Sequence, residues 1–383
     1  MSFFVANPDS NYMDDIFAQK LKAFSNPAFN SEDQKKLCTY HHKLILTEVI
    51  PAYQELADSL ESLRGTGKSS RGLAFFEGGR EYYLYLLQSQ TGTYVPVGQI
   101  EKRLSAQLLS DYREISSLLK QNSSLIDRLN QCSGELTLTP TQMLEKLPEL
   151  MKKDFPELKD ATYELRTVHP SMKKFLSPAF YLTPPVDTRT PNVIYINDSG
   201  HTSSLELFGT LAHEGFPGHL YQTVSFAENN PSDIRYLVTS SGYVEGWATY
   251  VESYGYEYAA SLMNDPDSAK NAVRLAWLNR SMNLCIYSLI DIGIHYRGWD
   301  AARTAVFLKA FGINNASTAA EIYQYIVETP GNYLKYYWGY LNFLDLKTVC
   351  QKRLGDDFDL KEFHRRILDI GPVQFPVLEK YMK

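Results

Sequence analysis

The stretch TLAHEGFPGHLYQ, residues 210–222, places two histidines on either side of a proline and a glycine. The usual zinc-binding pattern His-Glu-x-x-His works because residues four apart lie on one face of a helix. Here His213 and His219 are six apart, so their imidazole rings would diverge on a regular helix. The stretch therefore either binds no metal or lies on a helix that is interrupted between Glu214 and His219.

Pro217 predicts such an interruption. It has no N–H group to bond the carbonyl of His213, and its ring clashes with that carbonyl, so the helix must open there. Gly218 then supplies the backbone freedom that re-aims the chain. We therefore predict that His213 and His219 face one metal ion. The alternative is that His213 caps or packs the helix and that His219 is a core histidine.

A second stretch, YVEGWATYVESYG at residues 243–255, favours the metal-site interpretation. Glu245 and Glu252 are seven apart, so both carboxylates lie on one face of the same helix. A catalytic zinc site commonly takes two histidines, one carboxylate and a water, which makes Glu245 the third candidate ligand. Glu252 fits as the acceptor that orients a ligating histidine. The alternative, a solvated helix face, is disfavoured by the small and apolar residues Gly246, Trp247 and Ala248.

The remaining sequence predicts a mainly α-helical (α+β) fold. Residues 1–155 are expected to form an N-terminal helical region that packs on a zinc-binding catalytic region, residues 156–383. The stretch NVIYIN, residues 192–197, is the best strand candidate and predicts a small sheet or hairpin near the zinc helix. Long helices are expected after it, at residues 204–222, 240–263, 268–296, 299–311, 317–327 and 332–354.

Composition limits the remaining function classes. The net charge is −6, and lysines and arginines are scattered, which argues against nucleic-acid binding. The four cysteines are far apart without C-x-x-C pairing, which predicts free, buried thiols. The first residues lack a secretory leader, and no apolar run is long enough to span a membrane, so a cytoplasmic location is expected. A leader removed before residue 1 would not be visible.

Two motifs carry a family resemblance. VEGWATYVE is similar to the glutamate helix of gluzincins of the aminopeptidase N type, whose first glutamate binds zinc. HEGFPGH followed by EGWATYVE resembles more closely the bacterial family called domain of unknown function 885. Further landmarks follow in family order, including YLTPPVDTRTPNVIYIN, DIGIHYRGW, TPGNYLKYYWG and FHRRILDIG. The resemblance spans nearly the whole chain and implies a gluzincin-like helical metallopeptidase body.

Three further residues are candidates for contacts with a substrate. Tyr336, which matches the family pattern Pro-Gly-x-x-x-x-Tyr, and His295 in GIHYRGW would donate hydrogen bonds to the oxyanion of a tetrahedral intermediate. Both fit equally well as satisfied polar groups of the core. Asn197 ends the predicted strand, and an edge strand there would bind an extended peptide. For the Asn197 side chain itself, a turn role at the start of NDSG is favoured.

Together these residues predict a zinc-dependent metallohydrolase that acts on peptide or peptide-like bonds. His213, His219 and Glu245 would hold one zinc ion, and Glu214 would be the general base for the attacking water. A catalytically silent peptide-binding protein and a zinc hydrolase of non-peptide amides or esters are the alternatives. No Gly-x-Ser-x-Gly elbow supports a serine hydrolase. The sequence leaves the physiological substrate, the end from which cleavage starts and the oligomeric state open.

Overall fold

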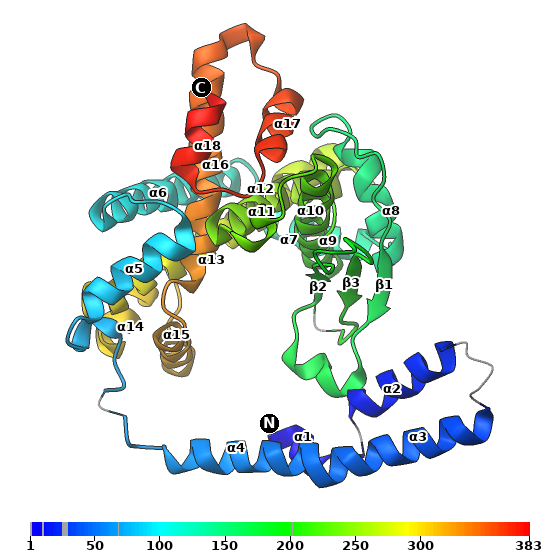
Figure 1. Ribbon diagram of the computed structural model, residues 1–383. Helices are drawn as coiled ribbons and strands as arrows, with labels where there is room; N and C mark the ends of the chain where they lie inside the picture. Colours follow the sequence, from blue (N-terminus) through cyan, green and yellow to red (C-terminus); the bar gives the residue numbers. More distant parts are fainter. Residues whose placement is uncertain (1, 10, 25–29, 68, 201) are drawn as a thin grey trace. The chain divides into compact units, whose positions relative to one another are not determined.

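The computed structural model describes residues 2–9, 11–24, 30–67, 69–200 and 202–383. The predicted mainly helical α+β fold is confirmed, with a small three-stranded sheet. The chain forms two compact units (Figure 1): unit 1 comprises Met1–Ser70, Thr167–Ser177 and Asn197–Ser199, and unit 2 comprises Arg71–Arg166, Pro178–Ile196 and Gly200–Lys383. These units do not divide the chain at residue 155. The predicted division into a helical region, 1–155, and a catalytic region, 156–383, stays a prediction.

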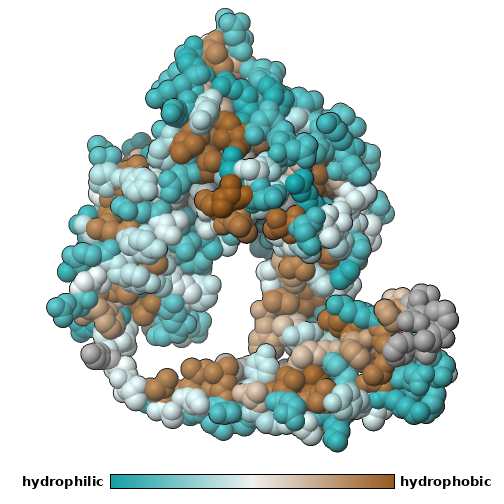
Figure 2. All heavy atoms as spheres, in the orientation of Figure 1, coloured by the Kyte–Doolittle hydropathy of each residue, from teal (hydrophilic) through white to brown (hydrophobic). Residues whose placement is uncertain are grey.

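Unit 1 is built around one long helical run. Its elements are α1 (Ser2–Ala6), α2 (Tyr12–Ala23), α3 (Ser31–Leu44), the π-helical turn η1 (Ile45–Val49), α4 (Ile50–Ser62) and the 3-10 helix η3 (Pro170–Phe175). The widened turn η1 lies just before Pro51, whose missing N–H group disrupts regular α-helical bonding. Figure 2 shows apolar side chains gathered along this run, and the exposed ones include Leu46, Leu56, Leu60 and Leu63.

Unit 2 contains the other helices. Before the sheet lie η2 (Leu73–Phe75), α5 (Gly79–Thr91), α6 (Val97–Gln121), α7 (Leu125–Glu135) and α8 (Pro140–Met151). After it follow α9 (Ser204–Glu214), α10 (His219–Glu228), α11 (Ile234–Leu237), α12 (Ser241–Ala260), α13 (Pro266–His295), α14 (Ala301–Lys309), α15 (Ala316–Glu328) and α16 (Asn332–Leu354). The chain ends with η4 (Gly355–Asp357), α17 (Leu360–Ile370) and α18 (Phe375–Met382).

The sheet has the order β1-β3-β2. Its strands are β1 (Glu164–Thr167), β2 (Ala179–Leu182) and β3 (Val193–Ile196), and β2 pairs antiparallel with β3 so that Tyr181 lies opposite Ile194. Strand β3 falls within the predicted stretch NVIYIN and carries the most buried side chains of the three strands. Because β3 is the middle strand, β1 and β2 form the edges, and β2 packs against α9.

Helices α12 to α16 begin and end within three residues of the predicted bounds because local signals mark their ends, whereas the helix predicted at 204–222 is two helices, the second of which ends at Glu228. At the start of α13, the Asp265 side chain accepts a hydrogen bond from the backbone N–H of Ser268, and Pro266 fills the first helical position. Helix α16 starts after Gly331, which has a left-handed conformation, and α15 starts after a capping Asn315. Such signals depend only on neighbouring residues, so sequence analysis finds them.

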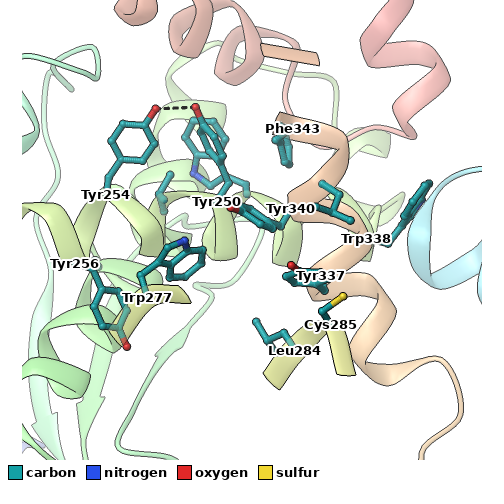
Figure 3. Close-up of a cluster of buried hydrophobic side chains, with 14 of the residues drawn as sticks. Tyr250, Tyr254, Tyr256, Trp277, Leu284, Cys285, Tyr337, Trp338, Tyr340 and Phe343 are labelled. Atoms are coloured by element: carbon teal, nitrogen blue, oxygen red, sulfur yellow. Dashed lines mark hydrogen bonds between the residues drawn. The ribbon is translucent and has the colours of Figure 1, made fainter. Parts of the chain in front are cut away.

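The core of unit 2 lies around α12, which packs against α9, α13 and α16. Figure 3 shows aromatic side chains from three helices meeting there. Trp277 of α13 lies edge-on to Tyr340 of α16, with ring centroids 5.6 Å apart. On α12, the hydroxyls of Tyr250 and Tyr254 are hydrogen-bonded at 2.9 Å. The tyrosines of this cluster therefore serve in packing, where their rings contribute apolar area and the hydroxyls of Tyr250 and Tyr254 pair with each other.

The cysteines are free thiols, and Cys132, Cys285 and Cys350 are buried as predicted, whereas Cys38 is partly exposed. None of the described helices combines the length and the apolar character that a membrane crossing requires. The expected cytoplasmic location stays a prediction.

Helices α12 and α16 approach so closely that their backbones touch. A Cβ atom added at Gly246 of α12 would lie 2.5 Å from the Cα of Gly339 of α16. One added at Gly339 would lie 2.2 Å from the carbonyl oxygen of Gly242. Such distances leave no room for a methyl group, so this crossing requires glycine on both helices.

We therefore expect Gly246→Ala to destabilise the protein. The added methyl group must push the two backbones apart, and overpacking of this kind costs about 1–3 kcal/mol. Urea unfolding followed by circular dichroism would measure the loss. Gly134→Ala, in α7, is the matched control because a Cβ there meets nothing within 4 Å. Alanine favours a helix by about 1 kcal/mol over glycine, so the control should be neutral or stabilising. Equal stability of the two variants would contradict the close-contact argument.

Candidate metal centre

The turn between α9 and α10 brings the two histidines of HEGFPGH together. Helix α9 ends at Glu214 and α10 begins at His219, and the Phe216–Pro217 peptide bond between them is cis. Gly218 packs against His213, where a Cβ atom would lie 1.8 Å from the carbonyl oxygen, so only glycine fits. The predicted helix break is confirmed.

A tryptophan from α12 holds this turn in place. The indole nitrogen of Trp247 donates a hydrogen bond to the carbonyl oxygen of Pro217 at 2.9 Å, and both groups are buried. The Trp247 ring is fully buried and packs edge-on against Phe155. The helix break is therefore a fixed part of the core, attached to the same helix that carries Glu245.

The three candidate ligands converge. The rings of His213 and His219 lie 4.8 Å apart and nearly perpendicular, at 86°. Their Nε2 atoms lie 3.8 Å and 3.3 Å from the same carboxylate oxygen, Oε2 of Glu245. One ligand atom from each residue lies within 4.8 Å of the others. Among the described residues, this is the group of histidine, cysteine and acidic side chains that could hold a metal ion.

The chemistry of this group suits a divalent metal ion. Two imidazole nitrogens and one carboxylate oxygen are a ligand set found in catalytic zinc sites, which keep a fourth position open for water. The side chains of His213, His219 and Glu245 are 10%, 14% and 21% exposed, so the group is sheltered but not sealed. Burial opposes charge on Glu245, but both histidines outweigh it and lower the pKa of its carboxyl group.

Glu252 lies behind His213, as predicted for an orienting residue. Its Oε2 is 3.3 Å from Nδ1 of His213, while Nε2 of that ring faces Glu245. The other oxygen, Oε1, accepts a hydrogen bond from Nε of Arg280 at 3.0 Å. Burial lowers the pKa of His213, but Glu245 and Glu252 outweigh it and raise that pKa well above its usual value. Without a metal, a proton on His213 therefore stabilises the cluster.

Glu214 is fixed by the sheet. Its Oε2 accepts a hydrogen bond from the backbone N–H of Tyr181 at 2.9 Å, and Tyr181 lies in edge strand β2. Glu214 is the residue after His213 and acts electrostatically on His213 and Tyr336. A carboxylate thus stands beside the three candidate ligands without being one of them.

Tyr336 of α16 also lies beside the cluster. Its hydroxyl is hydrogen-bonded to Glu245, and its ring lies 6.4 Å from the ring of His213. Burial, together with Glu245 and Glu214, raises the pKa of Tyr336, so its hydroxyl keeps its proton and can donate. The neighbouring Lys335 places its Nζ 3.9 Å from Oε1 of Glu245.

His295 does not join this group. It is fully buried at the end of α13, where Nδ1 accepts a hydrogen bond from the backbone N–H of Leu73 and Nε2 donates to the carbonyl oxygen of Ile326. It follows Arg280 by 15 residues on α13, which is about 22 Å along the helix axis. Both ring nitrogens are used and the ring is far from the ligands, which corrects the prediction that His295 contacts an oxyanion.

Asn197 is also a structural residue in this geometry. Its amide nitrogen donates to the carbonyl oxygens of Lys173 and Leu176, both at 2.8 Å, and the side chain is buried. It follows β3, which is the middle strand and not an edge strand. The favoured turn role fits these contacts, and a peptide strand would instead have to pair with β1 or β2.

Sequence analysis missed Arg280, Tyr181 and Lys335. A signal existed for Arg280, since it is a charged residue within the largely apolar helix α13, a position that calls for a buried partner. Lys335 directly precedes the proposed Tyr336. No sequence signal marks Tyr181, because its contribution is a backbone N–H group that nearly every residue has.

The chain belongs to a family described as "Bacterial protein of unknown function (DUF885)", which it matches over residues 4–382. The resemblance drawn from HEGFPGH and EGWATYVE is thereby confirmed. A search of curated proteins finds no match.

Two solved structures share the fold. One is a "putative lipoprotein" from Colwellia psychrerythraea, with a TM-score of 0.80 and 20% sequence identity, over 99% of this chain and 68% of that one. The other is a "putative lipoprotein of unknown function" from Shewanella oneidensis, with a TM-score of 0.62 and 17% identity, over 96% of this chain and 69% of that one. At these identities the similarity shows the fold alone.

The raised pKa of His213 leads to a pH prediction. At pH 7 the metal-free imidazole holds a proton, and a metal ion must displace it to bind. Zinc binding should therefore release roughly one proton from this residue, and zinc affinity should fall by about tenfold per pH unit for each proton displaced as the pH is lowered. Titration calorimetry in two buffers with different ionisation enthalpies would measure the protons. Heats that are equal in both buffers would contradict it.

A second prediction concerns Glu252. Replacing it with glutamine removes the charge that orients His213, so zinc affinity should fall about ten- to a hundredfold. The partner Arg280 is 45% exposed, so water can solvate its guanidinium and the fold should persist. Competition titration with a zinc chelator would measure the affinity. Glu257→Gln is the control, because Glu257 is exposed on the same helix. Equal affinities for both variants would exclude the orienting role.

Proposed function

We propose that this DUF885 member is a zinc-dependent metallohydrolase of gluzincin type that cleaves peptide or peptide-like amide bonds. The observation that carries the proposal is the convergence of His213, His219 and Glu245 within 4.8 Å. The two histidines flank a fixed helix break, and Glu245 comes from α12. All three ligands lie within residues 156–383, the region that we assign to catalysis. Of the N-terminal region, α5 and α8 pack against α12 and would then support it.

The neighbouring side chains support a hydrolytic mechanism. His213, His219 and Glu245 would hold the zinc ion, which would supply Lewis acidity for the water and the substrate carbonyl. Glu214, aligned by the Tyr181 amide, accepts the proton of the attacking water and passes it to the leaving amine. Tyr336 donates its hydroxyl to the oxyanion that forms at the scissile carbonyl. Glu252 keeps the His213 ring in its binding orientation.

A peptide is the substrate class that the surroundings favour. Edge strand β2 packs on α9, the helix that ends at Glu214. The Tyr181 N–H group bonds Glu214 and not β3, so this side of β2 faces the catalytic carboxylate. Edge strands are a common way to bind a peptide main chain beside a reactive centre.

The roles of metal binding and proton transfer can be separated by two variants. Glu214→Gln should leave zinc content unchanged and reduce peptide hydrolysis by ~100- to 10,000-fold, because it removes the general base. Glu245→Gln should lower both zinc content and rate, because it removes an anionic ligand. Glu257→Gln serves again as the exposed control. Zinc per chain by mass spectrometry and turnover on a mixed peptide library would be measured for each protein.

The wild-type results distinguish the alternatives. Zinc binding with cleavage of esters or non-peptide amides, but of no peptide, would indicate a non-peptide hydrolase. Zinc binding without any hydrolysis would indicate a silent binding protein. Near-normal turnover by Glu214→Gln would remove Glu214 from the mechanism.

A further inference from the structure

We propose that a pocket between α13, α15 and α16 is a specificity pocket that takes a bulky apolar side chain, preferably an aromatic one, of the substrate. This inference rests on the proposed function and names the substrate feature that the same site selects. The pocket has a volume of about 270 Å³ and is lined by Tyr287, Glu321, Ile322, Tyr325, Ile326 and Tyr333.

The lining is an aromatic and aliphatic surface. The ring of Tyr333 lies 4.9 Å from that of Tyr287 and 6.1 Å from that of Tyr325. Ile322 and Ile326 are four apart on α15, so their side chains lie on the same helix face and form the aliphatic wall. Tyr325 is 49% exposed, which leaves this wall accessible from solvent. Ligand pockets commonly have this character, with apolar walls and few polar groups.

The pocket borders the candidate metal centre through α16. Tyr333 and Tyr336 are three apart on this helix, so they share a face, with Tyr333 in the pocket and Tyr336 bonded to Glu245. Tyr325 acts electrostatically on both tyrosines. A substrate whose carbonyl lies beside Tyr336 would therefore have a neighbouring side chain within reach of Tyr333.

A second connection runs through Arg280 of α13. Its guanidinium bonds Glu252, which contacts His213, and also acts on the hydroxyl of Tyr333. Helices α13 and α16, which line the pocket, thus also carry Arg280 and Tyr336, which interact with Glu252 and Glu245, and the two helices pack against each other. One substrate molecule would therefore place its scissile bond at the metal centre and a neighbouring side chain in the pocket.

The lining chemistry selects the class of side chain. Burying an aromatic or long aliphatic side chain among tyrosine rings and isoleucines removes apolar surface from water, whereas a small side chain would fill little of the volume. An anionic side chain would meet Glu321. A cationic side chain could pair only with Glu321 among the lining residues, and this carboxylate is exposed to solvent. Arg280, which acts on Tyr333, would repel a second positive charge. An uncharged aromatic ring avoids both conflicts.

The test uses peptides of one framework that carry Phe, Ala, Lys or Glu at each position in turn. Hydrolysis by the zinc-loaded protein gives kcat/KM, and fluorescence anisotropy with the zinc-loaded Glu214→Gln variant gives binding without turnover. At one position near the scissile bond, the Phe peptide should exceed the Ala peptide by roughly ten- to two-hundredfold, the discrimination typical of an apolar pocket.

Two variants connect this preference to the pocket. Tyr325→Ala removes an exposed wall, and Ile322→Arg places a charge among the rings. Each should reduce the Phe-to-Ala ratio to within a few-fold of one. Tyr112→Ala is the control, because Tyr112 is 57% exposed on α6 and does not line the pocket. It should keep the wild-type ratio. Thermal unfolding of all three variants shows whether they remain folded.

The outcomes separate this inference from the proposed function. If the protein hydrolyses peptides but kcat/KM depends neither on the varied side chain nor on Tyr325→Ala, the specificity pocket is excluded and the proposed hydrolase activity stands. A preference for Lys or Glu would overturn the aromatic assignment. Phe-dependent binding that Tyr325→Ala weakens, without any hydrolysis, would support the pocket and overturn the peptidase. Neither binding nor hydrolysis of any peptide would overturn both.

Discussion

The close approach of α12 to its neighbours is the constraint on which the candidate site depends. Gly246 touches the backbone of Gly339 on α16, and a Cβ at Gly255 would lie 2.5 Å from the Cβ of Ala212 on α9. Each contact lies beside a candidate ligand: Gly246 follows Glu245, and Ala212 precedes His213. Small residues therefore fix the distances between three helices whose larger side chains meet at one point. A centre that needs atoms placed within fractions of an ångström requires rigid supports of this kind.

Sequence analysis identified the candidate ligands, which the structure brings together, because their signals are local. The spacing of Glu245 and Glu252 depends only on helical periodicity, and the break at Pro217 and Gly218 follows from backbone chemistry. The helices after the sheet were similarly predictable, since caps and prolines mark their ends. His213, Glu214 and His219 all lie within the 13 residues 210–222, and Glu245 begins the EGWATYVE stretch. Two short motifs were therefore enough to find the candidate ligands and the candidate general base.

The remaining features depend on contacts between distant segments. The motif around His295 suggested a contact with an oxyanion. Its ring instead accepts a hydrogen bond from the backbone N–H of Leu73, which is 222 residues away, and donates one to the carbonyl oxygen of Ile326. The turn role favoured for Asn197 fits its contacts, but the strand before it was considered as an edge although it is the middle strand, because strand order is not visible in the sequence. The pocket of Tyr287, Ile322 and Tyr333 needs three helices to assemble, and periodicity within one helix cannot show which faces will meet.

The charges around the candidate centre indicate why it suits a cation. Glu214, Glu245 and Glu252 bring three carboxylates, while the cationic side chains nearby are Arg280 and Lys335. With neutral imidazoles this group is negative, and the raised pKa of His213 shows that a proton relieves the imbalance. Counted with Arg280 and Lys335, the three carboxylates leave a net charge of −1, so a divalent ion bound by neutral imidazoles would make the group positive. That positive charge would lie near Tyr336, where the carbonyl of a substrate would develop negative charge. The same carboxylates that attract the metal therefore leave, once it is bound, a field suited to stabilising an oxyanion.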